Sequence, residues 1–355
     1  MVATVSMSTS AERTERDQRY ARQMILPVVG EAGQERLRCA RVLVVGAGAL
    51  GSPVLQYLTG AGVGQIELVD ADAVALHNLH RQILYTESDV GQAKARVAAR
   101  RLQALNSEVQ FHVHTIALNP RNAADWVAQA DVVIDCADSF AVTYTLSDEC
   151  CRQNTPYISA SVLGLSGYVG GFCSGAPSVR ALFDAPPQSA ASCSSSGVLA
   201  PVAGMVASLQ AQMALAVVLD LQPSPLGQMV TMDGAQYQFR SFRFDDAPEP
   251  DSDIGFPFIA LSDVSQQDYV IDLRAADEIL NEAMELRPAA PCQVQRMSAQ
   301  ELRENGLPAI AKSARLVLCC TTGLRAWRVA RSLSAQWQAP IVLLSASGER
   351  VFSEL

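Results

Sequence analysis

The sequence predicts an α/β fold: a doubly wound, mostly parallel sheet of Rossmann type with an antiparallel extension, and then a second, small α/β domain. Three observations carry this prediction. Short apolar runs alternate with helical patterns through residues 41–161. A glycine-rich turn joins the first run to the first helical pattern. An acidic, proline-containing segment at 245–255 separates this part from a C-terminal region where the alternation starts again.

The predicted elements of the first domain follow one another in the order expected for βαβ units. Strands are expected at 41–45, 65–70, 109–115, 131–136 and 156–161, with helices at 50–62 and 91–105. An antiparallel part follows, with strands at 165–174, 227–233 and 237–244, a mobile loop at 184–197 and a helix at 198–221. Such a sheet binds ligands at the carboxyl ends of its strands.

The second domain is expected to be smaller. Buried strands are predicted at 269–274 and 315–320, and a helix at 324–336. We therefore expect four segments along the chain. They are a flexible tail (1–15), a large α/β domain (16–244), a linker (245–256) and a small α/β domain (257–355).

The composition favours a folded cytoplasmic protein. Of 355 residues, 49% are hydrophobic and 18% charged, which argues against disorder. The net charge of −9 makes nucleic acid a poor partner. No secretory signal pattern is present at the N-terminus. Gln210, Gln212 and Asp220 interrupt the apolar stretch at 198–221, so we expect a buried or interface helix there and no membrane span.

The glycine-rich turn has the pattern G-x-G-x-x-G, at Gly46, Gly48 and Gly51. Glycines let the backbone approach a ligand, and the N-terminus of the following helix favours anionic groups. Asp70 ends the next strand, where a carboxylate can bind ribose hydroxyls. By itself this pattern leaves NAD, FAD, S-adenosylmethionine and ATP open.

The charged residues beyond the turn favour ATP. Asn78 and Arg81 follow the ribose-binding end, and Lys94 stands at the start of a helix where its ammonium can reach a phosphate. Asp138 follows another buried strand and can hold Mg²⁺, which takes one or two carboxylates together with phosphate oxygens. Two cations and a metal-binding acid suit a triphosphate, whereas a NAD-dependent oxidoreductase has no need of them.

At these motifs the chain resembles the ThiF/MoeB/HesA family, which is related to the ubiquitin-activating enzymes. The matching segments are 19–23, 46–51, 70–72, 78–82, 91–94 and 136–138. The resemblance implies that ATP is bound by Gly46, Gly48, Ala49, Gly51, Asp70, Asp72, Asn78, Arg81, Gln82 and Lys94. It also implies that Asp138 binds Mg²⁺, and that Arg22 reaches the ATP site of a second subunit in a homodimer.

The implied activity is adenylation of the C-terminal Gly-Gly carboxylate of a ubiquitin-like sulfur carrier of MoaD or ThiS type. Arg22, Arg81, Lys94 and Mg²⁺ would neutralise the phosphate charge as it redistributes in the transition state. No general base is needed, because the carboxylate is already ionised. Two alternatives stay open: adenylation of a small-molecule or tRNA-linked carboxylate, and a non-catalytic nucleotide-binding scaffold.

Each of these charged residues also has a purely structural interpretation. Asp138 could cap the helix that begins near Ser139, because aspartate is a favoured cap. Lys94 could be a solvated helix residue. Arg22 could pair with Glu31 or Glu35 at the surface.

The chain departs from the family at three places. Ser178 and Ala181 occupy the positions of the first C-x-x-C pair, and the second pair is absent, so we expect no structural zinc. Ala49 stands where glycine is frequent, which is tolerated if its φ is negative. Ser139 stands where asparagine is usual.

Two cysteines are candidates for sulfur chemistry. Cys193 aligns with a family cysteine that in some members links to the carrier or accepts sulfur, although it could be a chance loop cysteine. Cys320 opens a C-x4-R loop that resembles rhodanese domains, and Asp272 and Arg274 match their D-x-R strand. Backbone N–H groups at the helix start would lower the pKa of Cys320. An active sulfurtransferase, supplied by a cysteine desulfurase, and a degenerate structural domain both stay open.

Overall fold

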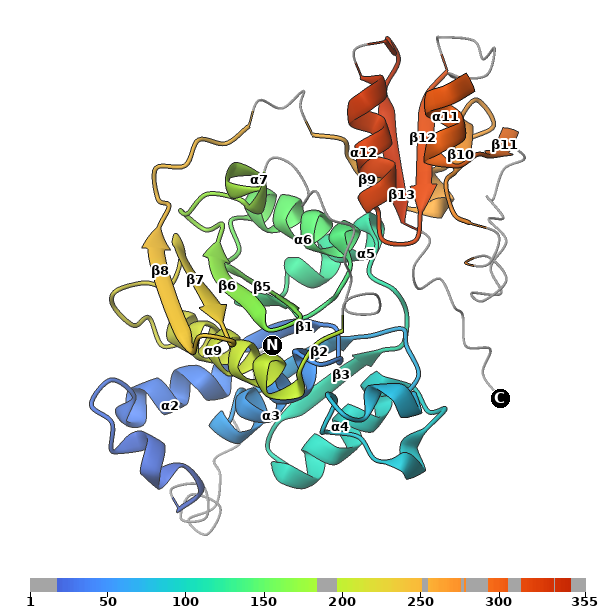
Figure 1. Cartoon of the computed structure of the whole chain (residues 1–355). Coiled ribbons are helices and arrows are strands. Elements are labelled where there is room, and N and C mark those ends of the chain that lie inside the picture. Colours follow the sequence, from blue (N-terminus) through green and yellow to red (C-terminus); the bar gives the residue numbers. More distant parts are fainter. Residues whose placement is uncertain are drawn as a thin grey trace, which may run out of the picture.

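The described part of the chain, residues 18–183, 197–250, 255–275, 278, 293–305, 314–334 and 336–345 of a computed structural model, contains two sheets (Figure 1). The strands of the larger sheet are β1 (Arg41–Val45), β2 (Gln65–Val69), β3 (Gln110–His114), β4 (Val132–Asp135), β5 (Tyr157–Leu163), β6 (Ser166–Phe172), β7 (Gln228–Asp233) and β8 (Gln238–Arg243). Their order is β3-β2-β1-β4-β5-β6-β7-β8. The first five strands pair in parallel and the last three are antiparallel, so the predicted fold class is confirmed.

The sheet carries helices on both faces because its central strands are apolar on both sides. In β1 the run Val42–Val45 is buried throughout, and β4 is buried along its whole length. The main helices are α2 (Gly30–Cys39), α3 (Gly51–Ala61), α4 (Lys94–Leu105), α5 (Pro120–Val127), α6 (Phe140–Gln153), α7 (Val179–Leu182) and α9 (Ala200–Val218). Helices α3, α4 and α9 share one hydrophobic core, whereas α5 and α6 belong to the other.

Helix α9 is long and apolar enough to cross a membrane by length and composition. It packs instead against α3 and against β5 and β6, with Val206, Ala207 and Ala214 buried in the core of the first domain. The expectation of a buried helix therefore agrees with the structure, while the cytoplasmic location stays a prediction.

The second sheet consists of five parallel strands in the order β11-β10-β12-β13-β9. Its strands are β9 (Phe258–Ile259), β10 (Tyr269–Asp272), β11 (Gln293–Arg296), β12 (Leu316–Cys320) and β13 (Ile341–Ser345), and its helices are α11 (Ala299–Asn305) and α12 (Leu324–Leu333). The predicted strands at 269–274 and 315–320 and the helix that follows are present. The linker at 245–256 stays our proposed boundary between the two domains.

The two domains pack against each other through α5 and α6 (Figure 1). The N–H of Ala141 in α6 donates a hydrogen bond of 3.0 Å to the carbonyl oxygen of Thr322, in the loop after β12. Arg121 in α5 forms a 2.6 Å ion pair with Asp263. The ring of Phe140 lies 6.3 Å from that of Phe258, centroid to centroid. The start of α6 is therefore shared between the domains.

Candidate functional site

The glycine-rich turn follows β1 and packs directly on the end of β4. Gly46 has a φ of +96°, and a Cβ there would lie 2.6 Å from the carbonyl oxygen of Cys136. At Gly51 a Cβ would lie 2.0 Å from the carbonyl oxygen of Gly46. Only glycine fits these two positions. Ala49 is not among the residues of positive φ, so the alanine is tolerated as expected.

Asp70 holds the turn to the end of β2. Its carboxylate accepts hydrogen bonds of 2.7 Å from the backbone N–H groups of Ala47 and Asp72. Burial raises the pKa of Asp70 to about 6, although the neighbouring charge of Lys94 opposes this. An ionised, desolvated carboxylate at this place is a strong acceptor for ribose hydroxyls.

Lys94 is buried, and its ammonium points into the same site. Its Nζ donates a 2.9 Å hydrogen bond to Asp72, whose own side chain is 70% exposed. Burial lowers the pKa of Lys94, but the charges of Asp70, Asp72 and Asp138 outweigh burial and raise it. Lys94 therefore stays protonated, and it is not a solvated helix residue.

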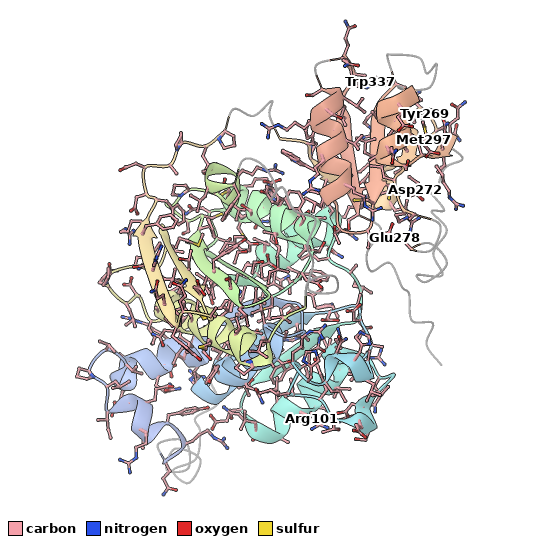
Figure 2. All side chains as sticks on the ribbon, in the orientation of Figure 1. Arg101, Tyr269, Asp272, Glu278, Met297 and Trp337 are labelled. Carbon is pink, nitrogen blue, oxygen red and sulfur yellow. The ribbon has the colours of Figure 1, made fainter. Side chains whose placement is uncertain are left out.

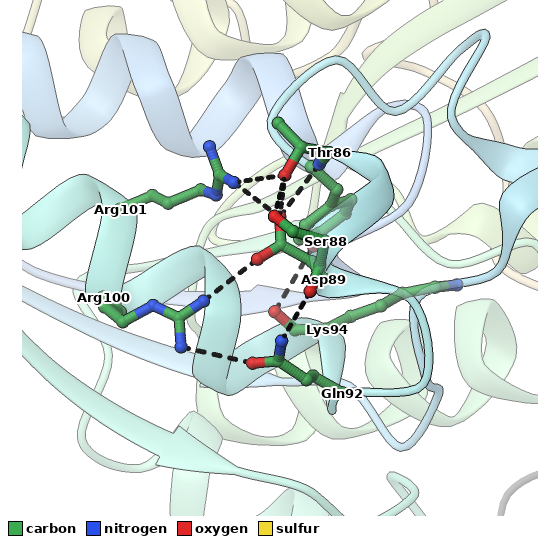
Figure 3. Close-up of polar contacts among 8 residues, drawn as sticks. Thr86, Ser88, Asp89, Gln92, Lys94, Arg100 and Arg101 are labelled. Carbon is green, nitrogen blue, oxygen red and sulfur yellow. Dashed lines mark hydrogen bonds and ion pairs between the residues drawn. The ribbon is translucent and has the colours of Figure 1, made fainter.

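A buried carboxylate fixes the loop that leads to Lys94 (Figure 3). Asp89 accepts hydrogen bonds from Arg100 at 3.0 Å and from Arg101 at 2.6 Å, both on α4, and from the N–H and hydroxyl of Thr86. Figure 3 shows the side chain of Lys94 pointing away from this cluster. The sequence analysis missed Asp89, because its partners lie eleven and twelve residues farther along the chain.

Arg81 and Asn78 form a second polar group beside the turn. Arg81 donates a 2.7 Å hydrogen bond to the side-chain oxygen of Asn78, which is buried at the end of the short helix η1 (Leu76–Asn78). Gln82 is buried as well, and its Oε1 has no hydrogen-bond partner in the described structure. This acceptor is therefore available to a donor group of a ligand.

Asp138 lies in the loop between β4 and α6, with its carboxylate exposed. It does not cap α6, because the N-cap residue is Ser139 and no side-chain capping bond forms. Within the described residues Asp138 has no hydrogen-bond or ion-pair partner, and the hydroxyl of Ser139 is buried and orphaned. A free carboxylate beside an orphaned hydroxyl fits a hydrated Mg²⁺, which needs few protein ligands.

No cluster of three metal-ligating side chains occurs in the part of the chain that the structure describes. At Ser178, which stands where the family has the first cysteine of a zinc-binding pair, the N–H and the hydroxyl each donate a 2.6 Å hydrogen bond to Glu249. This contact joins the segment after β6 to the segment after β8. The sequence analysis missed Glu249, because nothing in its local pattern points to Ser178.

One of the predicted residues, Arg22, stands apart from this site. Arg22 is exposed in the helical segment 18–24 and contacts none of the residues above. It does not pair with Glu31 or Glu35, and Glu35 is bound by Arg38 instead. Cys193 lies outside the described residues, so its role stays a prediction.

Cys320 lies at the end of β12 and is 1% exposed. The N–H of Ala326 donates a 3.4 Å hydrogen bond to its Sγ. Burial nevertheless raises the pKa of the thiol, while backbone N–H groups and Arg325 oppose the rise. The expected lowering of this pKa was therefore wrong, because the loss of solvent outweighs the helix-start donors.

Two ion pairs lie around this loop, one buried and one partly exposed. Arg274 binds Asp272 at 2.9 Å with both side chains buried, and Arg325 binds Glu278 and the carbonyl of Leu273. Figure 2 shows Asp272 and Glu278 toward the end of the second domain that faces the first domain, with Trp337 at the opposite end. The sequence analysis missed Glu278.

Comparisons with known proteins match the first domain. A model of the ThiF family matches residues 20–253. A sulfur carrier protein adenylyltransferase of Thermus thermophilus is 42% identical over 230 residues, which are 62% of this chain and 85% of the relative. The adenylyltransferase and sulfurtransferase MOCS3 of Bos taurus is 42% identical over 228 residues. That match covers 63% of this chain and 50% of MOCS3, so the chain matches only about half the length of this relative.

Solved structures give the same picture of the fold. MccB of E. coli in complex with MccA-N7isoASN is 25% identical, with a TM-score of 0.58, over 65% of this chain and 73% of that one. MccB with ATP has a TM-score of 0.57 over similar shares, 65% and 72%. PaaA, at 20% identity and a TM-score of 0.54 over 68% and 78%, shows the fold alone.

Proposed function

This chain belongs to the ThiF family, and from that premise we propose that it is an adenylyltransferase for the C-terminal carboxylate of a ubiquitin-like sulfur carrier ending in Gly-Gly. One observation supports this most: the turn at Gly46 brings together a ribose-binding acid, Asp70, and a protonated buried amine, Lys94. Asp138, whose charge also acts on Lys94, completes the group.

In the proposed reaction, an oxygen of the carrier carboxylate attacks the α-phosphorus of ATP. The bond from that phosphorus to the bridging oxygen breaks, and pyrophosphate leaves. Lys94 and Arg81 would stabilise the phosphate charge, and Asp70 would orient the ribose. When Mg²⁺ is bound by Asp138, it supplies further positive charge to the phosphates. Lys94 uses one of its three N–H donors for Asp72 in this structure, so the others remain for phosphate oxygens.

The quaternary structure and the sulfur step are part of the same proposal. Arg22 is exposed and has no ion-pair partner among the described residues, which supports a homodimer in which each subunit completes the ATP site of the other. The relatives named MOCS3 combine adenylyltransferase and sulfurtransferase in one name, and by analogy we extend the proposal to sulfur transfer by Cys320, with a cysteine desulfurase as donor. Cys193 stays a second candidate for a covalent link to the carrier.

The first test is ATP–pyrophosphate exchange with and without a carrier ending in Gly-Gly, in wild type and Asp138→Ala. We expect exchange that depends on the carrier and is lost in the variant. Asp246→Ala removes an exposed acid outside the site and serves as the control. Exchange without any carrier, but with a small carboxylate, would replace the proposal by small-molecule activation, and no exchange with bound ATP would leave the scaffold alternative.

A further inference from the structure

We propose that Asp135, a buried acid at the end of β4, is a positioning residue that fixes the loop carrying Asp138. The proposal rests on the function above, in which Asp138 holds the metal of Mg·ATP. No motif in the sequence points to Asp135, and the reaction as described does not use it. Its hydrogen bonds nevertheless connect the loop to α6, β5 and α9.

Three hydroxyl groups converge on one oxygen of Asp135. Its Oδ2 accepts hydrogen bonds from Thr143 at 2.6 Å, Tyr157 at 2.9 Å and Ser159 at 3.3 Å. Its Oδ1 accepts a 3.0 Å hydrogen bond from the N–H of Ala137. The carboxylate is fully buried and accepts from four donors, so its hydrogen bonds are satisfied within the protein.

These contacts clamp the loop from both of its ends. Ala137 lies immediately before Asp138, and Thr143 lies in the first turn of α6, immediately after the loop. Gln210 of α9 adds a third anchor, since its Nε2 donates a 2.6 Å hydrogen bond to the carbonyl of Asp135. Among the described residues Asp138 makes no such hydrogen bond. The position of its carboxylate therefore depends on the hydrogen bonds that hold the loop at Ala137, Thr143 and Gln210.

A purely structural role would not require a carboxylate here. Within the described residues no cation forms an ion pair with Asp135, and burying a carboxylate without one is costly. Burial raises the pKa of Asp135, and the four donors oppose that rise. An asparagine has the same shape, but its NH2 group would face either the N–H of Ala137 or the hydroxyls. The observed hydrogen bonds therefore use both oxygens of the carboxylate as acceptors, and an asparagine would have to rearrange them.

The test measures nucleotide binding by calorimetry, once with Mg·ATP and once with ATP in excess EDTA. Asp135→Asn should weaken the binding of Mg·ATP about tenfold, which corresponds to about 1.4 kcal/mol of binding free energy. Binding of ATP in EDTA should change much less, because among the described residues the side chains of Asp70, Lys94 and Arg81 make no hydrogen bond to this loop. Thr143→Val, which keeps the acid and removes one donor, should weaken Mg·ATP binding several-fold, and Thr143→Ser should restore it.

Two controls separate positioning from folding and from the metal assignment itself. Asp268→Asn removes a buried acid of the second domain, bound by Arg315, and should lower the melting temperature without changing nucleotide binding. In an Asp138→Ala background, Asp135→Asn should have no further effect on Mg·ATP binding.

The proposal is overturned if Asp135→Asn weakens both forms of ATP equally, or if the two substitutions add in the double variant. Failure of the metal assignment looks different, because Asp138→Ala would then leave the Mg·ATP affinity of otherwise wild-type protein unchanged. In that case the roles proposed for Asp138 and for Asp135 would both be wrong.

Discussion

Two loops of this molecule occupy equivalent places, each at the carboxyl end of a strand in a parallel part of its sheet. One connects β4 to α6 and carries Asp138, and the other connects β12 to α12 and begins at Cys320. The first loop presents its carboxylate to solvent, whereas the second encloses its thiol. The two loops meet where Ala141 donates to the carbonyl of Thr322. The difference shows that the end of a parallel strand provides a place for chemistry, while the packing above that end decides which group is accessible.

The largest effect is expected from replacing a positively charged side chain near each loop, Lys94 in the first domain and Arg325 in the second. Lys94→Met should lower carrier-dependent exchange about 100-fold, since it removes a preorganised charge from the phosphates. Arg325→Met removes the hydrogen bonds from Arg325 to Glu278 and to the carbonyl of Leu273, both in the second domain. It should leave the exchange rate unchanged. Arg96→Met, exposed on the same helix as Lys94, is the control. Equal losses in Lys94→Met and Arg325→Met would mean that the two sites act as one.

The next largest effect is expected at the contact between the glycine turn and the Asp138 loop. Gly46→Ala places a Cβ 2.6 Å from the carbonyl oxygen of Cys136, at positive φ, and should lower the free energy of unfolding by about 3 kcal/mol. Gly60→Ala in α3 meets no atom within 4 Å and should stabilise by about 0.5 kcal/mol. Chemical denaturation measures both. A neutral Gly46→Ala would show that the turn can move away from β4.

A smaller effect should reveal what closes the second loop. Ala141→Pro removes the N–H that binds Thr322 but stays within the first turn of α6, where proline is tolerated. Alkylation of Cys320, monitored by mass spectrometry, should become up to about tenfold faster. This factor corresponds to the free energy of one hydrogen bond. Exposed Cys39 and Cys151 provide internal references, and Ala141→Ser keeps the N–H. If alkylation of Cys320 is already as fast as that of Cys39 in wild type, the thiol is not enclosed in solution.

The smallest expected effect concerns pH at the open site. With a pKa of about 6, Asp70 is ionised at neutral pH and gains a proton as the pH falls. ATP prefers the ionised acceptor, so ATP affinity should fall about fourfold between pH 7 and pH 5.5. Asp70→Asn should bind ATP more weakly than wild type, and its ATP affinity should not change between pH 7 and pH 5.5. A wild-type affinity that is flat over this range would mean that Asp70 does not contact the nucleotide.

Much of the first site could be predicted from sequence, because its residues lie at strand ends that the βαβ pattern locates. Asp70 follows β2, Lys94 begins α4 and Asp138 follows β4, so the topology alone brings them together. The hydrogen bonds to Asp135 could not be predicted, since Thr143, Tyr157 and Gln210 come from three different elements. Their convergence depends on side-chain geometry that no local pattern records.

The second site was harder to predict for a related reason. The C-x4-R loop and the D-x-R strand are local patterns, and the strand and helix that they require are present. The burial of Cys320 comes from tertiary packing, and it reverses the pKa shift that the local pattern suggests. In the same way, Glu249 binds Ser178 across 71 residues. Arg22 and Cys193 remain predictions that depend on a second subunit and on a segment outside the described residues.

The hydrogen bond between Ala141 and Thr322 has a thermodynamic consequence for the whole chain. Because α6 begins three residues after the loop's Ala137, any ligand that shifts the start of α6 changes how firmly the second domain is held. Linkage makes such an effect mutual and equal in free energy. A carrier or sulfur donor that pulls the second domain away would therefore change nucleotide affinity by the same factor by which nucleotide changes the affinity for that partner.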